Sequence, residues 1–298
     1  MKTIDIICPL YNAEDYIKDF HNSLLMQENV LINKIIYILT ESKDNTEEYL
    51  KENHIEYQKI CKDDFSHSLI REKAGLASKA DIIVFVTQDV KIERRDWLYH
   101  LTKDINDIDT VACYSRQVTR YNNIEKYTRE ANYPEESFIV SLKDVNTLGL
   151  KTFFFSDASS AISRNIFEKL KAYDAKDLPT NEDMYIAYKI IMFGYSIKYC
   201  ADSEVVHSHD FTLKEIYDRY KLTGMFFKEN KYLDQYGTIG SGANLAVYIL
   251  KRIFEERRYT LFFRAPFDMA ARFMGMKAGM KWTVTRGNRI RSQIILKK

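Results

Sequence analysis

The sequence predicts an α/β fold, in which a mostly parallel sheet is flanked by helices and followed by a helical C-terminal extension. Two features of the first third predict it: short apolar runs alternate with amphipathic segments, and the run DIIVFV at 81–86 is apolar nearly throughout, as in strands buried on both faces. The composition of the whole chain is consistent with such a fold. The chain has 298 residues, of which 46% are apolar and 29% charged, so it can bury a large core and is not a disordered or collagen-like chain.

Strands and helices alternate in order along residues 3–86. Apolar runs predict strands at 3–8, 34–39, 55–60 and 81–86. The first strand is expected to end at Pro9, because proline donates no hydrogen bond to a sheet. Apolar residues at helical spacing predict helices at 13–27 and 68–77, and a capping turn at 42–45 predicts another between them. This order predicts parallel strands joined by right-handed crossovers.

The carboxyl ends of these strands are the expected ligand site, as in other open parallel sheets. The rule selects residues 9–12, 40–44, 63–67 and 87–89. No G-x-G-x-x-G follows the first strand and the sequence has no P-loop motif, so neither a dinucleotide site nor a P-loop site is predicted.

The formal net charge of +2 is unevenly distributed. Residues 251–298 carry 13 basic and 3 acidic residues, a net charge of +10, which leaves −8 for residues 1–250. Such a tail favours an anionic membrane surface, a nucleic acid or an acidic protein as partner. No apolar run reaches the roughly 18–20 residues that span a bilayer, and the acidic start does not resemble an export signal, so we expect a cytoplasmic protein.

Four cysteines lie in apolar, strand-like stretches: Cys8, Cys61, Cys113 and Cys200. None has metal-ligand spacing or a neighbouring cysteine. We therefore expect buried free thiols in a reducing compartment.

Three motifs occur at the expected strand ends: CPLYNAE at 8–14, TESKDNT at 40–46 and TQD at 87–89. In this order they make the chain resemble a family 2 glycosyltransferase with the GT-A fold, a Rossmann-like α/β fold, over about residues 1–225. The resemblance implies a nucleotide-sugar part at about 1–115 and an acceptor part at about 116–225, with residues 226–298 as a helical basic C-terminal region. It assigns to the nucleotide-sugar site Pro9, Tyr11, Asn12 and Gln88.

The resemblance also implies a divalent cation, Mn²⁺ or Mg²⁺, held by Asp89. Such an ion neutralises the charge that develops on the leaving diphosphate. The usual first Asp of this element is Thr87 here, which leaves room for another ligand. His207 and His209 alternate along an extended segment, so both rings can point the same way and supply it. The alternatives are that Asp89 caps a helix at 91–101 and that the histidines are ordinary polar residues.

Further donor contacts follow from the same resemblance. Where family members commonly have an Asp that holds the base, this chain has Thr40 and Glu41, which are expected to replace it. The stretch DDFSHSLIR at 63–71 resembles the F-x-H-x-x-x-R segment of bacterial rhamnosyltransferases. The donor-binding residues implied there and on a later helix are Asp64, His67, Arg71 and Arg219. The alternative for Arg71 is a solvated surface residue.

The segment NEDM at 181–184 opens a helix expected at 184–193. An attacking sugar hydroxyl must lose a proton, and a carboxylate within reach can take it. The resemblance implies that Asp183 is this general base, with Glu182 beside it, and that Asp157 contacts the acceptor. The alternatives are a helix-dipole pair for the first two and a capped turn for Asp157. Residues 116–152 match no motif and are expected to form a loop over the acceptor.

The resemblance, which at residues 65–67, 87–89 and 207–209 is to bacterial rhamnosyltransferases, implies an inverting glycosyltransferase that moves L-rhamnose from dTDP-rhamnose onto a growing or polyprenyl-diphosphate-linked bacterial polysaccharide. One alternative is a non-catalytic GT-A protein that binds a nucleotide or glycan, favoured by the missing carboxylates at Leu39 and Thr87. A second alternative, a nucleic-acid-binding protein, is disfavoured because the tail has no recognition motif. We therefore expect no nucleic acid partner.

The C-terminal region predicts an amphipathic helix at 259–282. One stripe of this helix carries Phe263, Phe267, Ala270 and Met274, and the neighbouring face carries Arg264, Asp268 and Arg272. Further basic residues follow at Lys277, Lys281, Arg286, Arg289 and Arg291, and Trp282 lies between them. A basic helix with aromatic residues is typical of proteins that bind peripherally to an anionic membrane, here the inner face of the cell membrane. Alternatively the stripe packs onto the catalytic domain or onto a second copy in a homo-oligomer.

Overall fold

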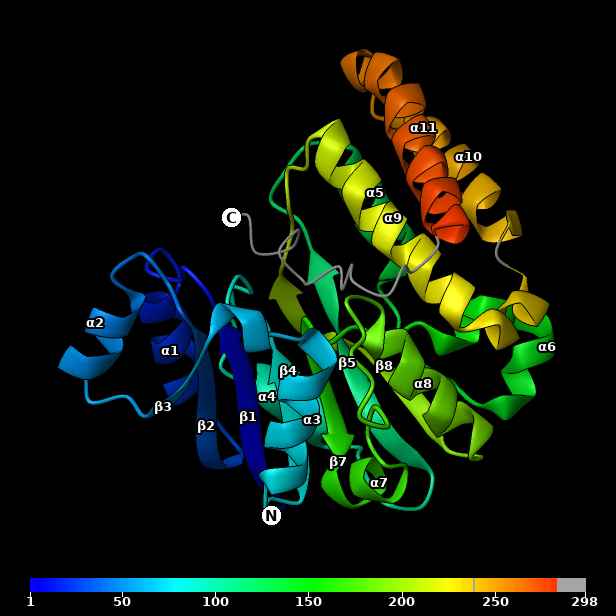
Figure 1. The fold of residues 1–298 in the computed structure, drawn as a ribbon. Coiled ribbons are helices and arrows are strands. Elements are labelled where there is room, and N and C mark those ends of the chain that lie inside the picture. Colours follow the sequence, from blue (N-terminus) through cyan, green and yellow to red (C-terminus); the bar gives the residue numbers. More distant parts are fainter. Residues whose placement is uncertain (238, 283–298) are drawn as a thin grey trace.

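The computed structural model describes residues 1–237 and 239–282 of the chain. The described residues form one mixed sheet of eight strands, in the order β3-β2-β1-β4-β7-β5-β8-β6, with helices on both faces (Figure 1). The strands are β1 (Thr3–Leu10), β2 (Leu31–Thr40), β3 (Tyr57–Ile60), β4 (Ile82–Val86), β5 (Thr110–Val118), β6 (Phe138–Val140), β7 (Ser159–Ser163) and β8 (Ser196–Val206). The helices are α1 (Ile17–Leu25), α2 (Thr46–Glu52), α3 (His67–Ala77), α4 (Trp97–Thr102), α5 (Ile124–Asn132), α6 (Val145–Leu148), α7 (Arg164–Lys169), α8 (Glu182–Met192), α9 (Leu213–Glu229), α10 (Ile239–Glu255) and α11 (Tyr259–Lys281).

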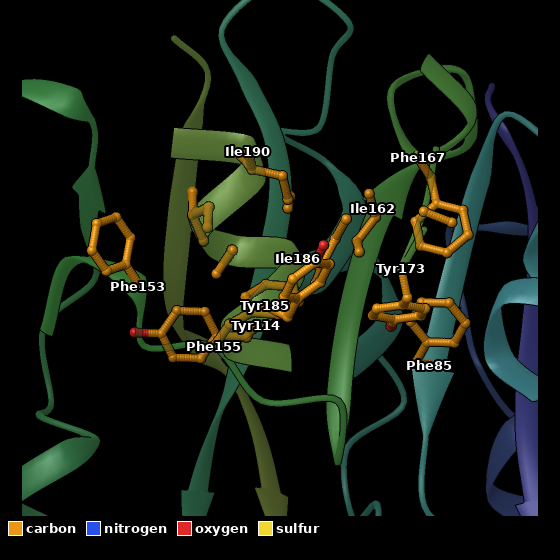
Figure 2. Packing of buried hydrophobic residues seen from close by; sticks show 14 of the residues in the cluster. Phe85, Tyr114, Phe153, Phe155, Ile162, Phe167, Tyr173, Tyr185, Ile186 and Ile190 are labelled. Carbon is orange, nitrogen blue, oxygen red and sulfur yellow. The ribbon is translucent and has the colours of Figure 1, made fainter. Parts of the chain in front are cut away.

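The apolar strands serve two cores, because successive side chains of a strand point to opposite faces of the sheet. On β1, Ile7 packs in a cluster with residues of α3, α7 and α8, whereas its neighbour Ile6 packs in a second cluster with residues of α1, α2 and α4. Figure 2 shows part of the first cluster, where the ring centroids of Phe85 on β4 and Phe167 on α7 are 5.8 Å apart. This two-sided burial explains the apolar strand sequences.

The first four strands are parallel, as the sequence predicts: β1 pairs with β2 and β4, and β2 pairs with β3. The prediction that the first strand ends at Pro9 is wrong, since β1 continues to Leu10. Pairing between β1 and β4 stops at Ile7, so at Pro9 the strand has only β2 as a neighbour. A proline is tolerated there because the open side requires no donor.

The prediction of a helix at 91–101 is also wrong for the first half of that segment. Lys91 and Val206 exchange two backbone hydrogen bonds of 2.9 Å, which form an isolated antiparallel bridge. The polar backbone groups of Lys91 are therefore satisfied across the chain, and α4 begins only at Trp97. As a consequence Asp89 is not the cap of a helix.

Two more segments differ from expectation. Residues 116–152 are not one loop, since they contain α5, β6 and α6. The first of these helices is stabilised by distant contacts, with Ile124 and Tyr127 buried against α10. Cys61 lies just after β3 and is exposed, whereas the other three cysteines are buried; all four are free thiols, as expected.

Strand β7 runs antiparallel between β4 and β5. Strand β5 in turn is parallel to β8, so β4, β5 and β8 all end at the same edge of the sheet. Because β7 is reversed, it begins at this edge: Ser159, its first residue, pairs with Val86, the last residue of β4. Residues that precede β7 therefore meet residues that follow β4, β5 and β8, and this edge carries the candidate site.

The last helices extend beyond the sheet, where α11 packs along α9 and α10 packs against α5 (Figure 1). Glycines allow the close approach of α9 and α11, since a Cβ at Gly279 would lie 2.0 Å from the carbonyl oxygen of Lys221. On the buried face of α11, Arg272 Nε donates to Asp268 Oδ1 at 2.5 Å. Among the described residues, no helix combines the length and hydropathy that crossing a bilayer requires.

The outward face of α11 carries the large apolar side chains. Phe263, Phe267 and Met274 are 75%, 63% and 55% exposed, so the alternative that this stripe packs onto the catalytic domain is wrong. Small and paired polar residues occupy the inward face instead. The predicted basic residues Arg286, Arg289 and Arg291 lie outside the described residues.

Candidate active site

The loop after β1 is held to the loop after β2 by Asn12. Its backbone is in the left-handed region (φ 46°), which asparagine tolerates better than most residues. Its N–H donates to Ser42 Oγ at 2.9 Å, and its Oδ1 accepts from the Lys43 N–H at 3.0 Å. The motif thus has a local structural role, and the contact of Asn12 with a nucleotide stays a prediction.

Gln88 has a similar task on the other side of β1. Its side-chain amide forms a two-point pair with the backbone of Tyr11, accepting from the N–H at 2.7 Å and donating to the carbonyl at 2.8 Å. Both polar ends of Gln88 are therefore engaged. The pair joins the end of β4 to the loop that follows Pro9.

Lys62, which belongs to no motif, lies at the predicted base-binding end of the edge. Its ammonium donates to the Tyr11 hydroxyl at 2.6 Å and lies 4.7 Å from the centroid of that ring. Its backbone N–H donates to Glu41 Oε2 at 3.4 Å. Thr40 is fully buried, while Glu41 and Asp64 are exposed. A lone lysine after a strand gives no recognisable sequence signal, so its place at this edge follows only from the tertiary structure.

Arg71 points into the protein. Its side chain is 2% exposed, and its Nη1 donates to Glu182 Oε1 at 2.9 Å and to the carbonyl of His67 at 3.1 Å. The surface alternative is therefore excluded, and the contact observed is with the acidic pair of α8. Burial, together with the nearby guanidinium, lowers the pKa of His67 to about 3, so this ring is neutral.

Asp157 lies just before β7, close enough to Arg71 and Glu182 to interact with their charges. It is 2% exposed, and its two oxygens accept from Ser160 Oγ at 2.7 Å and from the Tyr173 hydroxyl at 2.9 Å. Burial raises its pKa to about 6. The role of acceptor contact stays a prediction, and the bond to Ser160 matches the capped-turn alternative.

Asp183 is the second residue of α8 and is only partly buried. Burial, followed by the charges of Glu182 and Asp157, raises its pKa well above the usual value for a carboxyl group. Three carboxylates thus face one guanidinium, and Arg71 pairs directly with Glu182. We call Arg71, Asp157, Glu182 and Asp183 the acidic cluster. A carboxylate with a raised pKa and partial access to solvent is suited to accept a proton.

The second polar group consists of Asp89, His207 and His209, here called the Asp–His cluster. The two Nε2 atoms of the histidines are 3.1 Å apart, which confirms that both rings point the same way. Each also lies near the carboxylate, at 3.5 Å for His207 and 3.6 Å for His209. One ligand atom from each residue falls within 4.8 Å of the others, as metal coordination requires.

Charge and protonation suit this cluster to a cation. Burial and then His207 lower the pKa of His209 to about 3, so its ring is neutral and offers a lone pair. Burial alone would raise the pKa of Asp89, but the two imidazoles outweigh it and the pKa is lowered. One carboxylate oxygen and two imidazole nitrogens are donors that Mn²⁺ accepts, and carboxylate and phosphate oxygens also suit Mg²⁺.

Arg219 adjoins the Asp–His cluster through an aromatic bridge. Its guanidinium lies 4.7 Å from the ring centroid of Phe211, and that ring stacks on His209 with centroids 4.7 Å apart. The Arg219 side chain is exposed. It can therefore meet an anion bound beside the histidines.

Comparison with known proteins identifies the family of the chain. The model of the family described as Glycosyl transferase family 2 matches residues 5–171. Two curated relatives are O-antigen chain rhamnosyltransferases, WbaN of Salmonella anatum and RfbN of Salmonella typhimurium. Each is 30% identical to this chain, over 95% and 94% of it respectively and over 90% of each relative.

Solved structures show the same fold. The mannosyltransferase PcManGT from Pyrobaculum calidifontis, in complex with GDP-Man and Mn²⁺, superposes with a TM-score of 0.62 at 14% identity, over 93% of this chain and 87% of that one. The glucosyl-3-phosphoglycerate synthase from Mycobacterium tuberculosis, with Mg²⁺ and UDP, gives 0.51 at 14% identity, over 76% and 78%.

A mixed sheet of eight strands flanked by helices, in this strand order, is the GT-A fold. The chain belongs to glycosyl transferase family 2. Its partners in the reaction are thus a sugar donor and an acceptor.

Proposed function

We propose that the protein is an inverting rhamnosyltransferase that moves L-rhamnose from dTDP-rhamnose onto a polyprenyl-diphosphate-linked or growing bacterial polysaccharide. The observation that carries the reaction type is the partly accessible Asp183, whose pKa is raised. The choice of sugar is supported by the two relatives, whose names describe O-antigen chain rhamnosyltransferases. Residues of about 1–115 would bind the donor and those of about 116–225 the acceptor.

In the proposed reaction, the acceptor hydroxyl oxygen forms a bond to the anomeric carbon while the bond from that carbon to the diphosphate oxygen breaks. The electron pair leaves with the nucleotide diphosphate, and the hydroxyl proton passes to Asp183. Attack opposite the leaving group inverts the anomeric configuration. Arg219 stabilises the departing diphosphate by charge.

Asp89, His207 and His209 would hold a divalent cation, Mn²⁺ or Mg²⁺. When bound, such an ion neutralises negative charge on the diphosphate. The donor set and its spacing support this assignment. Because a single carboxylate is present, the histidines are essential members of the proposed site.

The test is a transfer assay with purified protein, radiolabelled dTDP-rhamnose and a polyprenyl-diphosphate saccharide. We expect labelled lipid product, release of dTDP, loss of activity with a chelator and recovery with Mn²⁺ or Mg²⁺. UDP-glucose and GDP-mannose serve as control donors, from which we expect less transfer than from dTDP-rhamnose. Tight binding of dTDP-rhamnose without transfer or hydrolysis would favour the non-catalytic alternative, and preference for another donor would overturn the choice of sugar.

We also propose that the C-terminal helices bind the anionic inner face of the cell membrane. The surface in question, called the aromatic face, consists of exposed side chains at the end of α10 and along α11: Phe254, Tyr259, Phe262, Phe263, Phe267, Phe273 and Met274. Soluble proteins rarely expose so many large apolar residues together, and such patches usually mark a binding surface.

The charge around the aromatic face supports an anionic membrane as its partner. Exposed basic residues accompany the aromatic face, namely Lys251, Arg257, Arg264, Lys277 and Lys281. Each Lys or Arg near an anionic membrane contributes about 1 kcal/mol of attraction. A lipid-linked acceptor would also be found at such a surface.

Vesicle sedimentation tests this docking. Wild type should pellet with vesicles of phosphatidylglycerol and phosphatidylethanolamine, less so at high salt, and not with phosphatidylcholine alone. Phe263→Ser combined with Phe267→Ser should abolish pelleting, whereas Phe193→Ser, which alters a similarly exposed phenylalanine at the end of α8 (62%), should not. Loss of a dimer in the double variant, without any lipid binding by wild type, would instead identify a homo-oligomer interface.

A further inference from the structure

Gln117 lies one residue before the end of β5 and contacts the Asp–His cluster from behind. It is 1% exposed. Its Oε1 is 2.9 Å from Nδ1 of His207 and also accepts from Nη1 of Arg129. Its Nε2 donates to Ser156 Oγ at 2.8 Å. All three contacts fix one orientation of the buried amide.

The partners decide which end of the amide faces His207. A guanidinium can only donate, so the atom that meets Arg129 must be the amide oxygen. The same oxygen faces Nδ1 of His207, and two acceptors would repel each other. Nδ1 therefore carries the hydrogen and donates it to Gln117.

The hydrogen on Nδ1 determines the state of the other ring nitrogen of His207, Nε2. A neutral imidazole with its hydrogen on Nδ1 has a lone pair on Nε2. That atom faces the cluster, 3.1 Å from Nε2 of His209 and 3.5 Å from Oδ1 of Asp89. Only this tautomer can offer Nε2 to a cation.

Arg129 is itself held in place. Its Nε donates to Glu125 Oε1 at 2.9 Å, one turn earlier on α5. Helix α5 is anchored in turn at the end of α10, where Lys126 Nζ donates to both oxygens of Glu256, the residue that follows this helix, at 2.7 and 2.9 Å. The acceptor presented to His207 is therefore part of a rigid array rather than a free surface amide.

We propose that Gln117 is a positioning residue of the cation site: it fixes the tautomer and the orientation of His207, so that Nε2 faces the bound ion. The inference rests on the proposed cation site. Outer partners of metal-bound histidines commonly act in this way, and their loss weakens metal binding by about 10–100-fold.

The experiment measures Mn²⁺ affinity of the full chain by electron paramagnetic resonance. Gln117→Leu removes the acceptor at similar volume and should raise the dissociation constant about 10–100-fold. Gln117→Glu keeps an acceptor for His207 and Arg129 and should bind Mn²⁺ at least as tightly as wild type. Ser156→Ala is the matched control, because it removes a hydrogen bond from the same amide but leaves its oxygen in place; its affinity should stay within threefold.

Nitrogen NMR of ¹⁵N-histidine-labelled, metal-free protein reads the tautomer directly. Wild-type His207 should carry its hydrogen on Nδ1, and Gln117→Leu should shift the population toward Nε2. Wild type with the hydrogen on Nε2 would overturn the inference even if the leucine variant fails to fold. So would a leucine variant that binds Mn²⁺ as wild type does. Absence of Mn²⁺ binding by wild type would instead remove the proposed cation site.

Discussion

The acidic cluster and the Asp–His cluster lie at the same edge of the sheet but have opposite electrostatic character. In the acidic cluster three carboxylates face one guanidinium, and the pKa values of Asp157 and Asp183 are raised. In the Asp–His cluster one carboxylate faces two imidazoles, and the pKa of Asp89 is lowered. The first arrangement favours taking up a proton, and the second favours keeping a negative charge for a cation. Residue type alone does not separate these tasks, since both clusters depend on aspartates.

The largest effect is expected for a variant that changes Asp183, the solvent-accessible carboxylate of the acidic cluster. Asp183→Asn should lower kcat by about 10²–10⁴-fold, because general-base catalysis contributes that much. The Mn²⁺ dissociation constant should stay within threefold of wild type, since the other cluster is intact. Transfer kinetics and a metal titration on the same preparation check both halves. Near-normal kcat would remove Asp183 from the mechanism.

Variants of the buried ion pair between Arg71 and Glu182 test whether this pair stabilises the acidic cluster. Arg71→Met should reduce the free energy of unfolding by about 3–5 kcal/mol, because Glu182 is left buried without its partner. The double variant Arg71→Met with Glu182→Leu should recover much of this loss. Urea unfolding measures all three proteins. If the double variant is as unstable as the single one, packing rather than unpaired charge explains the effect.

Asp89→Asn addresses the other cluster. Removing the only carboxylate should weaken Mn²⁺ binding by more than about 100-fold, beyond the effect of an outer partner. Asp96→Asn is the control, because Asp96 also has a lowered pKa but pairs with Arg94 outside the cluster. Equal losses in both variants would argue against a specific site.

The smallest effect concerns stability and pH. A carboxyl group with a raised folded-state pKa costs stability as pH rises from the unfolded value of 3.8 through the folded one. Asp183→Asn should therefore raise the Tm at pH 8 by a few degrees, since about 1 kcal/mol shifts Tm by roughly 2–4 °C in a chain of this size. The gain should vanish near pH 3.

The pH profile of kcat should follow the same group. Rate should rise with pH through the raised pKa of Asp183, because only the ionised carboxylate accepts a proton. A rate that is flat from pH 5 to pH 9 would contradict this prediction.

Part of this architecture follows from local sequence. The strands at 3–8 and 81–86 are predicted from apolar runs, and the helix at 259–282 from apolar periodicity. The helix expected at 184–193 is also present, although it begins two residues earlier, at Glu182. The polar residues at strand ends follow as well, because parallel strands deliver their carboxyl ends to one edge. The two histidines face one another because residues two apart in an extended chain point the same way.

Other features depend on contacts between distant segments. The bridge between Lys91 and Val206 prevents a helix that local propensity favours. Helix α5 is buried against α10, more than one hundred residues away, which local sequence cannot reveal. The burial of Arg71 against Glu182 likewise joins residues 111 positions apart.

The sequence by itself therefore determined the fold class, the family and the residue types available for chemistry. Only the tertiary structure decided how those residues are paired: Arg71 with Glu182, and Gln117 with His207. It also decided that the aromatic side of α11 faces outward, because the glycines of α9 and α11 pack closely on the inner side. The physical reason is that periodicity is a local property, whereas burial, pKa and partner choice depend on which distant groups share the same space.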